Sequence, residues 1–259
     1  MQNELKVVGI QADLIWENPA ANRKQFSKII YNLESDVDLI VLPEMFTSGF
    51  TMNPKNVAEK MEGDSISWMI QIVGERNVAI IGSLVIKEGN NYFNRLVFVH
   101  PSGKIETYDK QHLFTLAGEH KQYTAGSKKL IVDYKGWKIC PLVCYDLRFP
   151  VWTRNQENYD LFIFIANWPE KRINAWDILL KARAIENMSY VVGVNRVGID
   201  ENKHKYSGNS VVIDSLGNEI ASLKLNEIGI ITTTLNKDNQ DKIRKNLGFL
   251  DDGDAFEII

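Results

Sequence analysis

Short apolar runs alternate with amphipathic helical patterns along this chain, and this alternation constrains its fold more than any other feature. The run DLIVLP at residues 38–43 is nearly continuous in apolar side chains, as in strands buried on both faces. Before it, Asn18–Pro19 has the pattern of a helix cap followed by proline in the first turn. The helix predicted after this cap carries apolar residues at spacings of three and four: Phe26, Ile29, Ile30 and Leu33.

The same alternation continues to the end of the chain. Helical spacing of apolar residues recurs at 66–73 and 176–184, and residues 78–86 and 92–100 are two strand-like runs joined by a hairpin-like turn. Further strands are predicted at 6–11, 190–194, 209–214 and 229–234. This order predicts an α/β architecture with helices layered on mixed sheets. Since no linker or fixed-period repeat interrupts it, we expect one domain over residues 1–259.

Composition narrows the class of protein. With 44% hydrophobic and 24% charged residues, a soluble globular chain is expected. A net charge of -3 and a pI of about 5.9 disfavour nucleic acid as a partner. The longest apolar run, 161–166, is far shorter than the roughly 20 residues that cross a bilayer, so no membrane association is expected. The N-terminus lacks a signal-peptide pattern, and two cysteines four positions apart form no disulfide framework, which together favour the cytoplasm.

One of these cysteines occupies an unusual position. In LVCYDLRFP (142–150), Cys144 ends an apolar strand and is followed at once by Tyr145, Asp146 and Arg148. Most cysteines are small core residues, and Cys140, inside the apolar run, fits that description. Cys144 fits it less well, because ligands bind at the carboxyl ends of strands in α/β sheets. A nucleophilic cysteine there would need a base and a group that stabilises negative charge.

Two other reactive groups also follow strand-like segments. Glu44 comes directly after LIVLP, and Lys110 lies in YDKQHLF after the strand-like KIETY. Taken singly, each could be a solvated loop charge. Histidine, the usual partner of a nucleophilic cysteine, occurs in no recognisable signature, and we interpret all but His112 as polar surface residues: His100, His120 and His204.

The three segments VLPEMFTSGF, YDKQHLF and LVCYDLRFP, in this order, resemble the signature segments of the nitrilase superfamily, the carbon–nitrogen hydrolases with a Glu–Lys–Cys triad. The resemblance extends through 166–198 and 206–220 and covers roughly residues 5 to 235. It implies a four-layer α-β-β-α sandwich. It also implies a homodimer or higher homo-oligomer, with helices near the nucleophile packed across the two-fold axis. The tail at about 236–259 is a candidate to pack on a partner subunit.

Within the superfamily, PEMFTSGF, CYDLRFPVW and NWP look most like the bacterial omega-amidases. The implied substrates are terminal amides of small 2-oxo acids, such as 2-oxoglutaramate and 2-oxosuccinamate, hydrolysed through a Cys thioester without a metal or organic cofactor. Carried over by residue, Cys144 is the nucleophile and Glu44 the general base. Lys110 and the backbone N–H of Tyr145 stabilise the oxyanion, and Glu119 steadies Lys110.

Substrate contacts can be carried over only in part. Arg148 matches the family position implicated in binding the far carboxylate, although a structural ion pair with Asp146 or a helix end is the alternative. Aromatic residues beside the strand ends could wall the pocket or belong to the core: Phe46, Phe50 and Trp168. One helical turn apart, Arg183 and Glu186 are expected to form a helix-face ion pair or an interface.

Other activities use similar residues. A deaminated-glutathione amidase or an N-carbamoyl hydrolase would use the same triad with a different pocket, and attack on a nitrile would use the same nucleophile. A scaffold protein without catalysis would be expected to have lost a triad member. A Cys-dependent peroxidase or redox sensor often has a resolving cysteine, for which only Cys140 is available.

Overall fold

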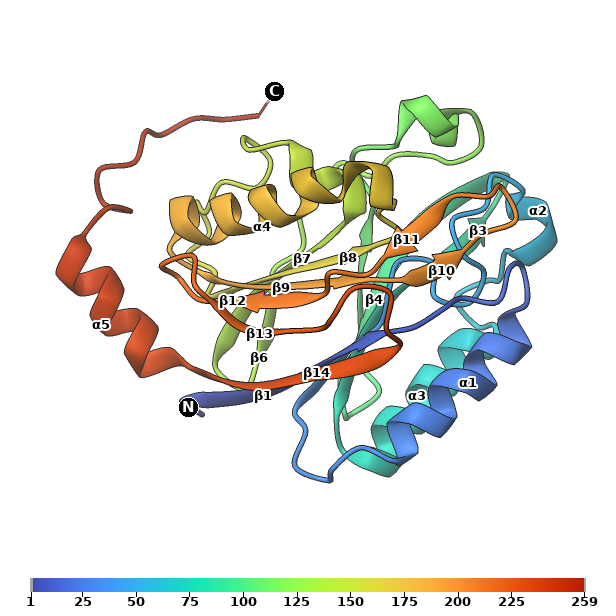
Figure 1. The fold of residues 1–259 in the computed structure, drawn as a ribbon, viewed down its shortest axis with the longest axis horizontal. Helices are drawn as coiled ribbons and strands as arrows, with labels where there is room; N and C mark the ends of the chain where they lie inside the picture. Colours follow the sequence, from blue (N-terminus) through green and yellow to red (C-terminus); the bar gives the residue numbers. More distant parts are fainter. Residues whose placement is uncertain (1, 259) are drawn as a thin grey trace.

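The computed structural model describes residues 2–258, in which two large sheets lie face to face (Figure 1). Within these residues, the first sheet has six strands in the spatial order β14 (Gly229–Asn236), β1 (Glu4–Gln11), β2 (Leu39–Val41), β3 (Ala79–Glu88), β4 (Asn91–Val99) and β5 (Ile105–Asp109). Strands β1, β2 and β3 are parallel, and the others pair antiparallel. The predicted hairpin at 78–100 is confirmed as β3 and β4.

The second sheet also has six strands among the described residues. Their spatial order is β13 (Glu219–Ser222), β12 (Val211–Ile213), β9 (Tyr190–Asn195), β8 (Leu161–Ala166), β7 (Trp137–Val143) and β6 (Val132–Tyr134). Strands β7, β8 and β9 lie inside the sheet and run parallel, so their carboxyl ends lie at the same end of the sheet. A smaller hairpin pairs β10 (Val197–Ile199) with β11 (Lys205–Ser207).

Alternation of side chains along the strands fills two separate cores. On β1, Val7 joins the core between the two sheets, whereas Val8 joins the core on the helix side of the first sheet. On β2, Leu39 and Val41 face the other sheet and Ile40 faces the helices. The prediction of a strand buried on both faces within residues 38–43 is therefore confirmed, although the strand itself covers only Leu39–Val41.

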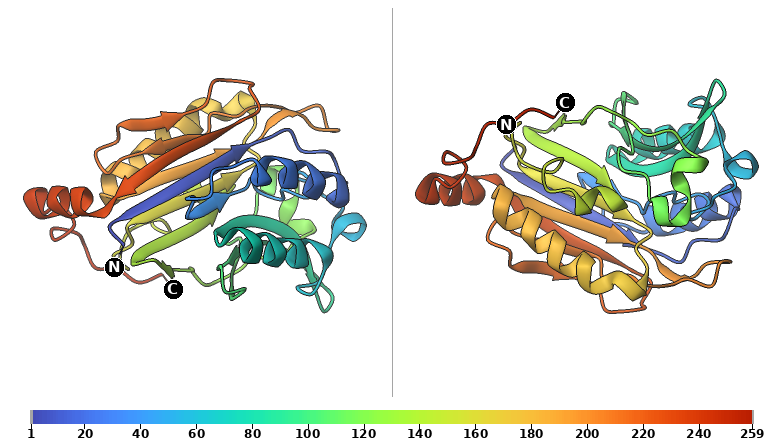
Figure 2. Two further views of the ribbon diagram at one scale, coloured as in Figure 1. Left: turned by 90° about the horizontal axis from the view of Figure 1, so that it is seen from below. Right: turned by 90° about the horizontal axis from the view of Figure 1, so that it is seen from above.

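Helices cover the outer face of each sheet. The pair α1 (Pro19–Tyr31) and α3 (Asp64–Arg76) lies on the first sheet, and α4 (Ile173–Asn187) lies on the second (Figure 2). The predicted start of α1 is confirmed, because the Asn18 side chain accepts a hydrogen bond from the backbone of Ala21 (3.1 Å). Helix, sheet, sheet and helix make the four-layer α-β-β-α sandwich that the family resemblance implied.

Short elements complete the chain: α2 (Pro54–Val57), η1 (Thr115–Ala117), η2 (Glu119–Lys121), η3 (Cys144–Arg148), η4 (Glu170–Arg172) and α5 (Lys237–Leu247). Helix α5 projects from the body of the sandwich (Figure 1). Its inner face is tied to Asp160, whose carboxylate pairs with Lys237 (2.6 Å) and Arg244 (3.1 Å). The start of the tail is therefore bound to its own chain.

Candidate active site

Three strand ends from the two sheets deliver the predicted catalytic groups. Glu44 lies in the turn after β2, and Lys110 directly follows β5 in the first sheet. Cys144 directly follows β7 in the second sheet. Because the sheets face each other, groups that are distant in the sequence can meet where these strands end. The site therefore depends on the sandwich as a whole.

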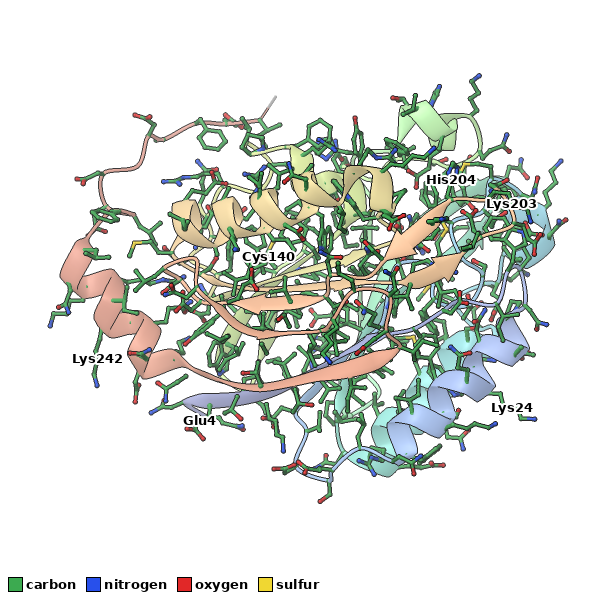
Figure 3. All side chains as sticks on the ribbon, in the orientation of Figure 1. Glu4, Lys24, Cys140, Lys203, His204 and Lys242 are labelled. Carbon is green, nitrogen blue, oxygen red and sulfur yellow. The ribbon has the colours of Figure 1, made fainter. Side chains whose placement is uncertain are left out.

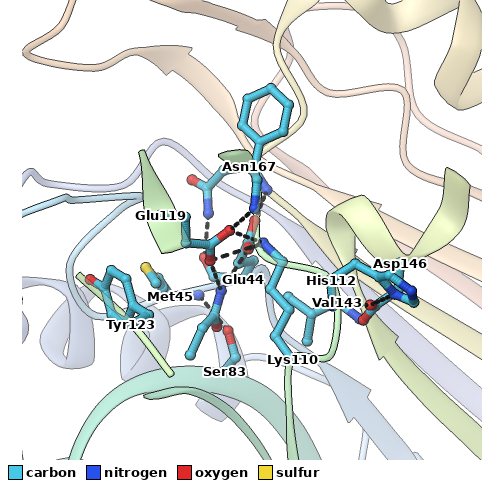
Figure 4. Close-up of polar contacts among 12 residues, drawn as sticks. Glu44, Met45, Ser83, Lys110, His112, Glu119, Tyr123, Val143, Asp146 and Asn167 are labelled. Atoms are coloured by element: carbon cyan, nitrogen blue, oxygen red, sulfur yellow. Dashed lines mark hydrogen bonds and ion pairs between the residues drawn. The ribbon is translucent and has the colours of Figure 1, made fainter. Parts of the chain in front are cut away.

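The ammonium group of Lys110 lies between two carboxylates (Figure 4). Its Nζ donates to Glu44 Oε1 (2.9 Å) and to both oxygens of Glu119 (3.1 and 2.9 Å). All three side chains are fully buried. Burial alone would lower the pKa of Lys110, but the two carboxylates more than offset it and raise the pKa above its usual value. Lys110 is thus a permanent cation within this acid–lysine cluster of Glu44, Lys110 and Glu119.

Glu119 binds Lys110 and is itself fixed by two further hydrogen bonds. Its Oε2 accepts a hydrogen bond from the backbone N–H of Phe114 (2.6 Å), and its Oε1 accepts one from Asn94 (3.2 Å). Burial raises the pKa of Glu119, although Lys110 opposes that shift. The expected contact between Glu119 and Lys110 is present, and its catalytic importance stays a prediction.

Two asparagines orient Glu44. Asn94 Nδ2 donates to Glu44 Oε1 (2.8 Å), and the backbone N–H of Asn167 donates to Glu44 Oε2 (2.8 Å). The Asn167 side chain also donates to the backbone oxygen of Glu44 (2.6 Å). Sequence reasoning missed both residues. Asn167 had the signal used for Glu44, a polar residue just past a buried strand, whereas Asn94 lies inside β4, where the sequence pattern marks nothing unusual.

Cys144 begins the short helix η3 with a left-handed backbone, φ of 46°. Such a conformation is uncommon for a non-glycine residue and is found at sites that aim a side chain. The residue keeps some exposure toward the cavity that it lines. Burial, followed by the negative charge of Glu44, raises the pKa of the Cys144 thiol, while Lys110 lowers it. The resting sulfur is therefore a thiol that needs a base.

A buried carboxylate holds the turn that carries Cys144. Asp146 accepts hydrogen bonds from the backbone N–H of Val143 (3.0 Å) and the hydroxyl of Tyr108 (2.8 Å). Its other oxygen accepts from the backbone N–H of His112 (3.0 Å) and lies 2.8 Å from the ring Nδ1. Figure 4 shows His112 and Val143 converging on this carboxylate. His112, the histidine whose role the sequence left open, thus supports the nucleophile turn.

The backbone N–H of Tyr145 lies in the first turn of η3. N–H groups in a first helical turn have no partner within the helix and can bind an anion. The Tyr145 ring lines the cavity and makes edge contacts with Phe114 and Phe149. This position suits the predicted oxyanion role, which stays a prediction.

A cavity of about 160 Å³ opens over Cys144. Its wall includes three of the four predicted substrate-binding residues: Phe50, Arg148 and Trp168. The Arg148 guanidinium stacks on Trp168 (4.9 Å), and the Lys110 ammonium lies 5.1 Å from the centre of the Phe50 ring. The alternative for Arg148, an ion pair with Asp146, is not formed among residues 2–258, since Asp146 pairs with His112. His204, which is labelled in Figure 3, also lines the cavity.

Phe46 is not a pocket residue, so that prediction is wrong. Its side chain is fully buried in the core between the first sheet and its helices, where it contacts Phe26 (5.6 Å between ring centres) and Trp68 (5.7 Å). The reason is that Met45 has a left-handed backbone, φ of 43°. The chain reverses there, so Glu44 faces the site while Phe46 packs under α1 and α3.

Other predictions concern residues outside the cavity. Cys140 is buried in the interior (Figure 3), and burial raises the pKa of its thiol. Arg183 forms the predicted helix-face ion pair with Glu186 (2.8 Å). Among residues 2–258, no group of three or more His, Cys, Asp or Glu side chains is arranged to hold a metal ion. The described helices include none that is long and apolar enough to cross a bilayer.

Comparisons with known proteins agree with this geometry. A family model described as carbon-nitrogen hydrolase matches residues 7–245. Omega-amidase YafV of Yersinia enterocolitica is 42% identical over 255 residues, which are 98% of this chain and 99% of that protein. The 2-oxoglutaramate amidase of Bacillus subtilis (strain 168) is 30% identical over 248 residues, 94% of this chain and 95% of that protein.

A solved structure supports the same assignment. XC1258 from Xanthomonas campestris, described as a CN-hydrolase superfamily protein with an arsenic adduct in the active site, superposes with a TM-score of 0.97 at 39% identity. The match covers 99% of this chain and 100% of that structure. The chain therefore belongs to the carbon-nitrogen hydrolase family.

Proposed function

We propose that this protein is an omega-amidase that hydrolyses the terminal amide of small 2-oxo acids, such as 2-oxoglutaramate and 2-oxosuccinamate. The observation that carries the proposal is Arg148, a guanidinium without an acidic partner among the described residues, on the wall of the cavity that holds Cys144. A guanidinium pairs with a carboxylate through two hydrogen bonds. The names of the omega-amidase and 2-oxoglutaramate amidase relatives support the same substrate class.

In the first half-reaction, the Cys144 sulfur attacks the amide carbon while Glu44 takes the thiol proton. A base is required because the raised pKa keeps the thiol protonated near neutral pH. The negative charge that develops on the amide oxygen is stabilised by the Tyr145 N–H and by the positive charge of the Lys110 ammonium group. Collapse of the tetrahedral intermediate breaks the carbon–nitrogen bond, and Glu44 returns the proton to the departing ammonia.

The second half-reaction regenerates the enzyme. Water attacks the thioester carbon while Glu44 accepts one of its protons. The carbon–sulfur bond then breaks as Glu44 returns this proton to the leaving sulfur, which releases the carboxylic acid and regenerates the Cys144 thiol. The hydrogen bonds from Asn94 and Asn167 keep Glu44 oriented for both proton transfers. Each catalytic group in these two half-reactions is a side chain or backbone N–H of the chain itself.

The size of the cavity favours a small substrate. At about 160 Å³, it is smaller than the roughly 300–1,000 Å³ typical of pockets for drug-sized ligands. A five-carbon 2-oxo acid amide suits this volume better than a deaminated tripeptide does. Because the same residues could attack a nitrile, amide and nitrile substrates have to be compared directly.

Ammonia release from a panel of compounds tests the proposal. The panel contains 2-oxoglutaramate, 2-oxosuccinamate, deaminated glutathione, an N-carbamoyl amino acid and a small nitrile. We expect turnover of the 2-oxo acid amides, which Cys144→Ala abolishes and the matched control Cys140→Ala retains. A wild-type enzyme inert on both 2-oxo acid amides but active on another compound would reject the substrate while keeping the hydrolase class.

We also propose assembly of the single-domain chain, residues 1–259, into a homodimer or higher homo-oligomer in the cytoplasm. Exposed apolar residues on and beside the outer face of α4 support this assembly: Val151, Ile178, Ile185, Leu216 and Ile220. Exposed Phe249 extends the apolar surface into the tail at 236–259, which is proposed to contact the partner. A monomer mass by light scattering at working concentration would contradict the assembly.

A further inference from the structure

A second arginine shares the cavity with Arg148. Arg172 lines the same cavity as Cys144 and stacks on the ring of Phe114 at 4.9 Å, as Arg148 stacks on Trp168 at 4.9 Å. Arg172 ends the short helix η4 and caps the start of α4, whereas Arg148 ends η3. The two guanidinium groups therefore come from separate segments that both follow strands of the second sheet.

Neither of these arginines is neutralised by the protein. The three buried arginines have acidic partners, whereas Arg148 and Arg172 are partly exposed. Arg95 pairs with Asp109 (2.7 Å), Arg183 with Glu186 (2.8 Å) and Arg196 with Asp13 (2.6 Å). Within residues 2–258, Arg148 and Arg172 form no ion pair, and their guanidinium groups donate no hydrogen bond. Two such cations beside one nucleophile favour an anionic ligand in this cavity.

We propose that Arg172 is a second substrate-binding residue, which acts with Arg148 to bind the 2-oxo acid end of the substrate. This inference rests on the proposed function. A 2-oxo acid presents two carboxylate oxygens and an adjacent ketone oxygen. One guanidinium fork pairs with two oxygens, and a second guanidinium supplies donors for the third. The aromatic rings hold both planar groups in place before binding, which reduces the entropy lost on binding.

The same experiment distinguishes this binding role of Arg172 from a purely structural one. The backbone N–H of Phe114, the residue on which Arg172 stacks, donates to Glu119, and Glu119 holds Lys110. If Arg172 acted only by steadying Phe114, its loss would disturb the acid–lysine cluster. Hydrolysis of every amide would then slow, charged or not.

The test compares two amides in Arg172→Met: 2-oxoglutaramate and pentanamide, which has the same chain length but no carboxylate or ketone. We expect kcat/KM for 2-oxoglutaramate to fall about 10- to 100-fold, mainly through KM, because a charge-assisted contact is lost. Turnover of pentanamide should stay within about two-fold. Arg172→Lys, which keeps the charge but loses the fork, should lie between. Lys171→Met, an exposed neighbour with the same loss of charge, is the control.

Binding without turnover gives a second measurement. Calorimetry of 2-oxoglutarate, the product anion, with Cys144→Ala should show about 10- to 100-fold weaker binding when Arg172→Met is added. Equal loss on both amides, a fall in kcat alone, or unchanged binding of 2-oxoglutarate would overturn the inference. If the wild type rejects 2-oxoglutaramate but hydrolyses glutaramate, the proposed function fails, and the pair glutaramate and pentanamide still tests Arg172 as a carboxylate contact.

Discussion

Among single residues, Lys110 depends strongly on its charged partners, because its ammonium group has no contact with solvent. Its ammonium group is fully buried and lies 2.9 Å from both Glu44 and Glu119. Removing one member of a buried ion pair is costly because the remaining charge has neither water nor a partner. In Lys110→Met two carboxylates would face each other without a cation between them.

We therefore predict that Lys110→Met abolishes ammonia release and lowers the free energy of unfolding by about 3–5 kcal/mol, measured by urea denaturation. Lys24→Met, at an exposed position on α1 (Figure 3), is the control and should leave both quantities nearly unchanged. Full turnover in Lys110→Met would contradict the oxyanion role, and unchanged stability would contradict the charge argument.

At the level of elements, the turn from β7 into η3 positions the nucleophile. The Asp146 carboxylate accepts hydrogen bonds from this turn and from the segment that follows Lys110, so it links the two sheets beside the site. An amide at this position retains only one accepting oxygen. The left-handed backbone of Cys144 would then lose part of its support.

For Asp146→Asn we expect a loss of about 1–3 kcal/mol in unfolding free energy and a fall in kcat larger than the change in KM. Steady-state kinetics and urea denaturation check both values. Asp133→Asn, at an exposed position of β6, is the control. A variant with normal kcat would show that Asp146 does not position Cys144.

Secondary-structure elements could be predicted from the sequence where the local residue pattern matches the burial seen in the structure. Strand β2 follows from its nearly continuous apolar run and the Asn18 cap from capping chemistry, and both are confirmed. Phe46 was assigned wrongly, because its direction depends on the left-handed backbone of Met45 and not on its nearness to Glu44 in the sequence. Asn94 has its role because its side chain reaches Glu44 and Glu119, which are distant in the sequence. The sequence pattern does not show which distant side chains come into contact.

For the whole molecule, catalysis depends on how the two sheets are stacked. Glu44 and Lys110 follow strands of the first sheet, and Cys144 and Asn167 follow strands of the second. Through the family resemblance, the motifs predicted that Glu44, Lys110 and Cys144 meet, but the spacing between the sheets is set by packing. Small residues at the interface therefore help to set this spacing.

Gly9 on β1 is such a residue. A Cβ atom there would lie 2.8 Å from a methyl group of Val194 on β9 of the opposite sheet and 3.0 Å from Ile231 on the neighbouring strand β14. Both distances are shorter than normal carbon contacts, so a side chain would push the sheets apart. Strand β1 is adjacent to β2, which leads to Glu44, and the shift would therefore reach the site.

We predict that Gly9→Val lowers the free energy of unfolding by about 1–3 kcal/mol through overpacking. It should also reduce kcat/KM more than that loss of folded protein explains, since displacements of about 1 Å can cost about 100-fold in rate. Gly74→Ala is the matched control: nothing lies within 4 Å of its Cβ position on α3, and replacing a helical glycine should stabilise by about 0.4–1 kcal/mol. If Gly9→Val and Gly74→Ala had the same melting temperature and the same kcat/KM, the prediction would be contradicted. The positions of Glu44 and Cys144 would then not depend on the spacing of the sheets at Gly9.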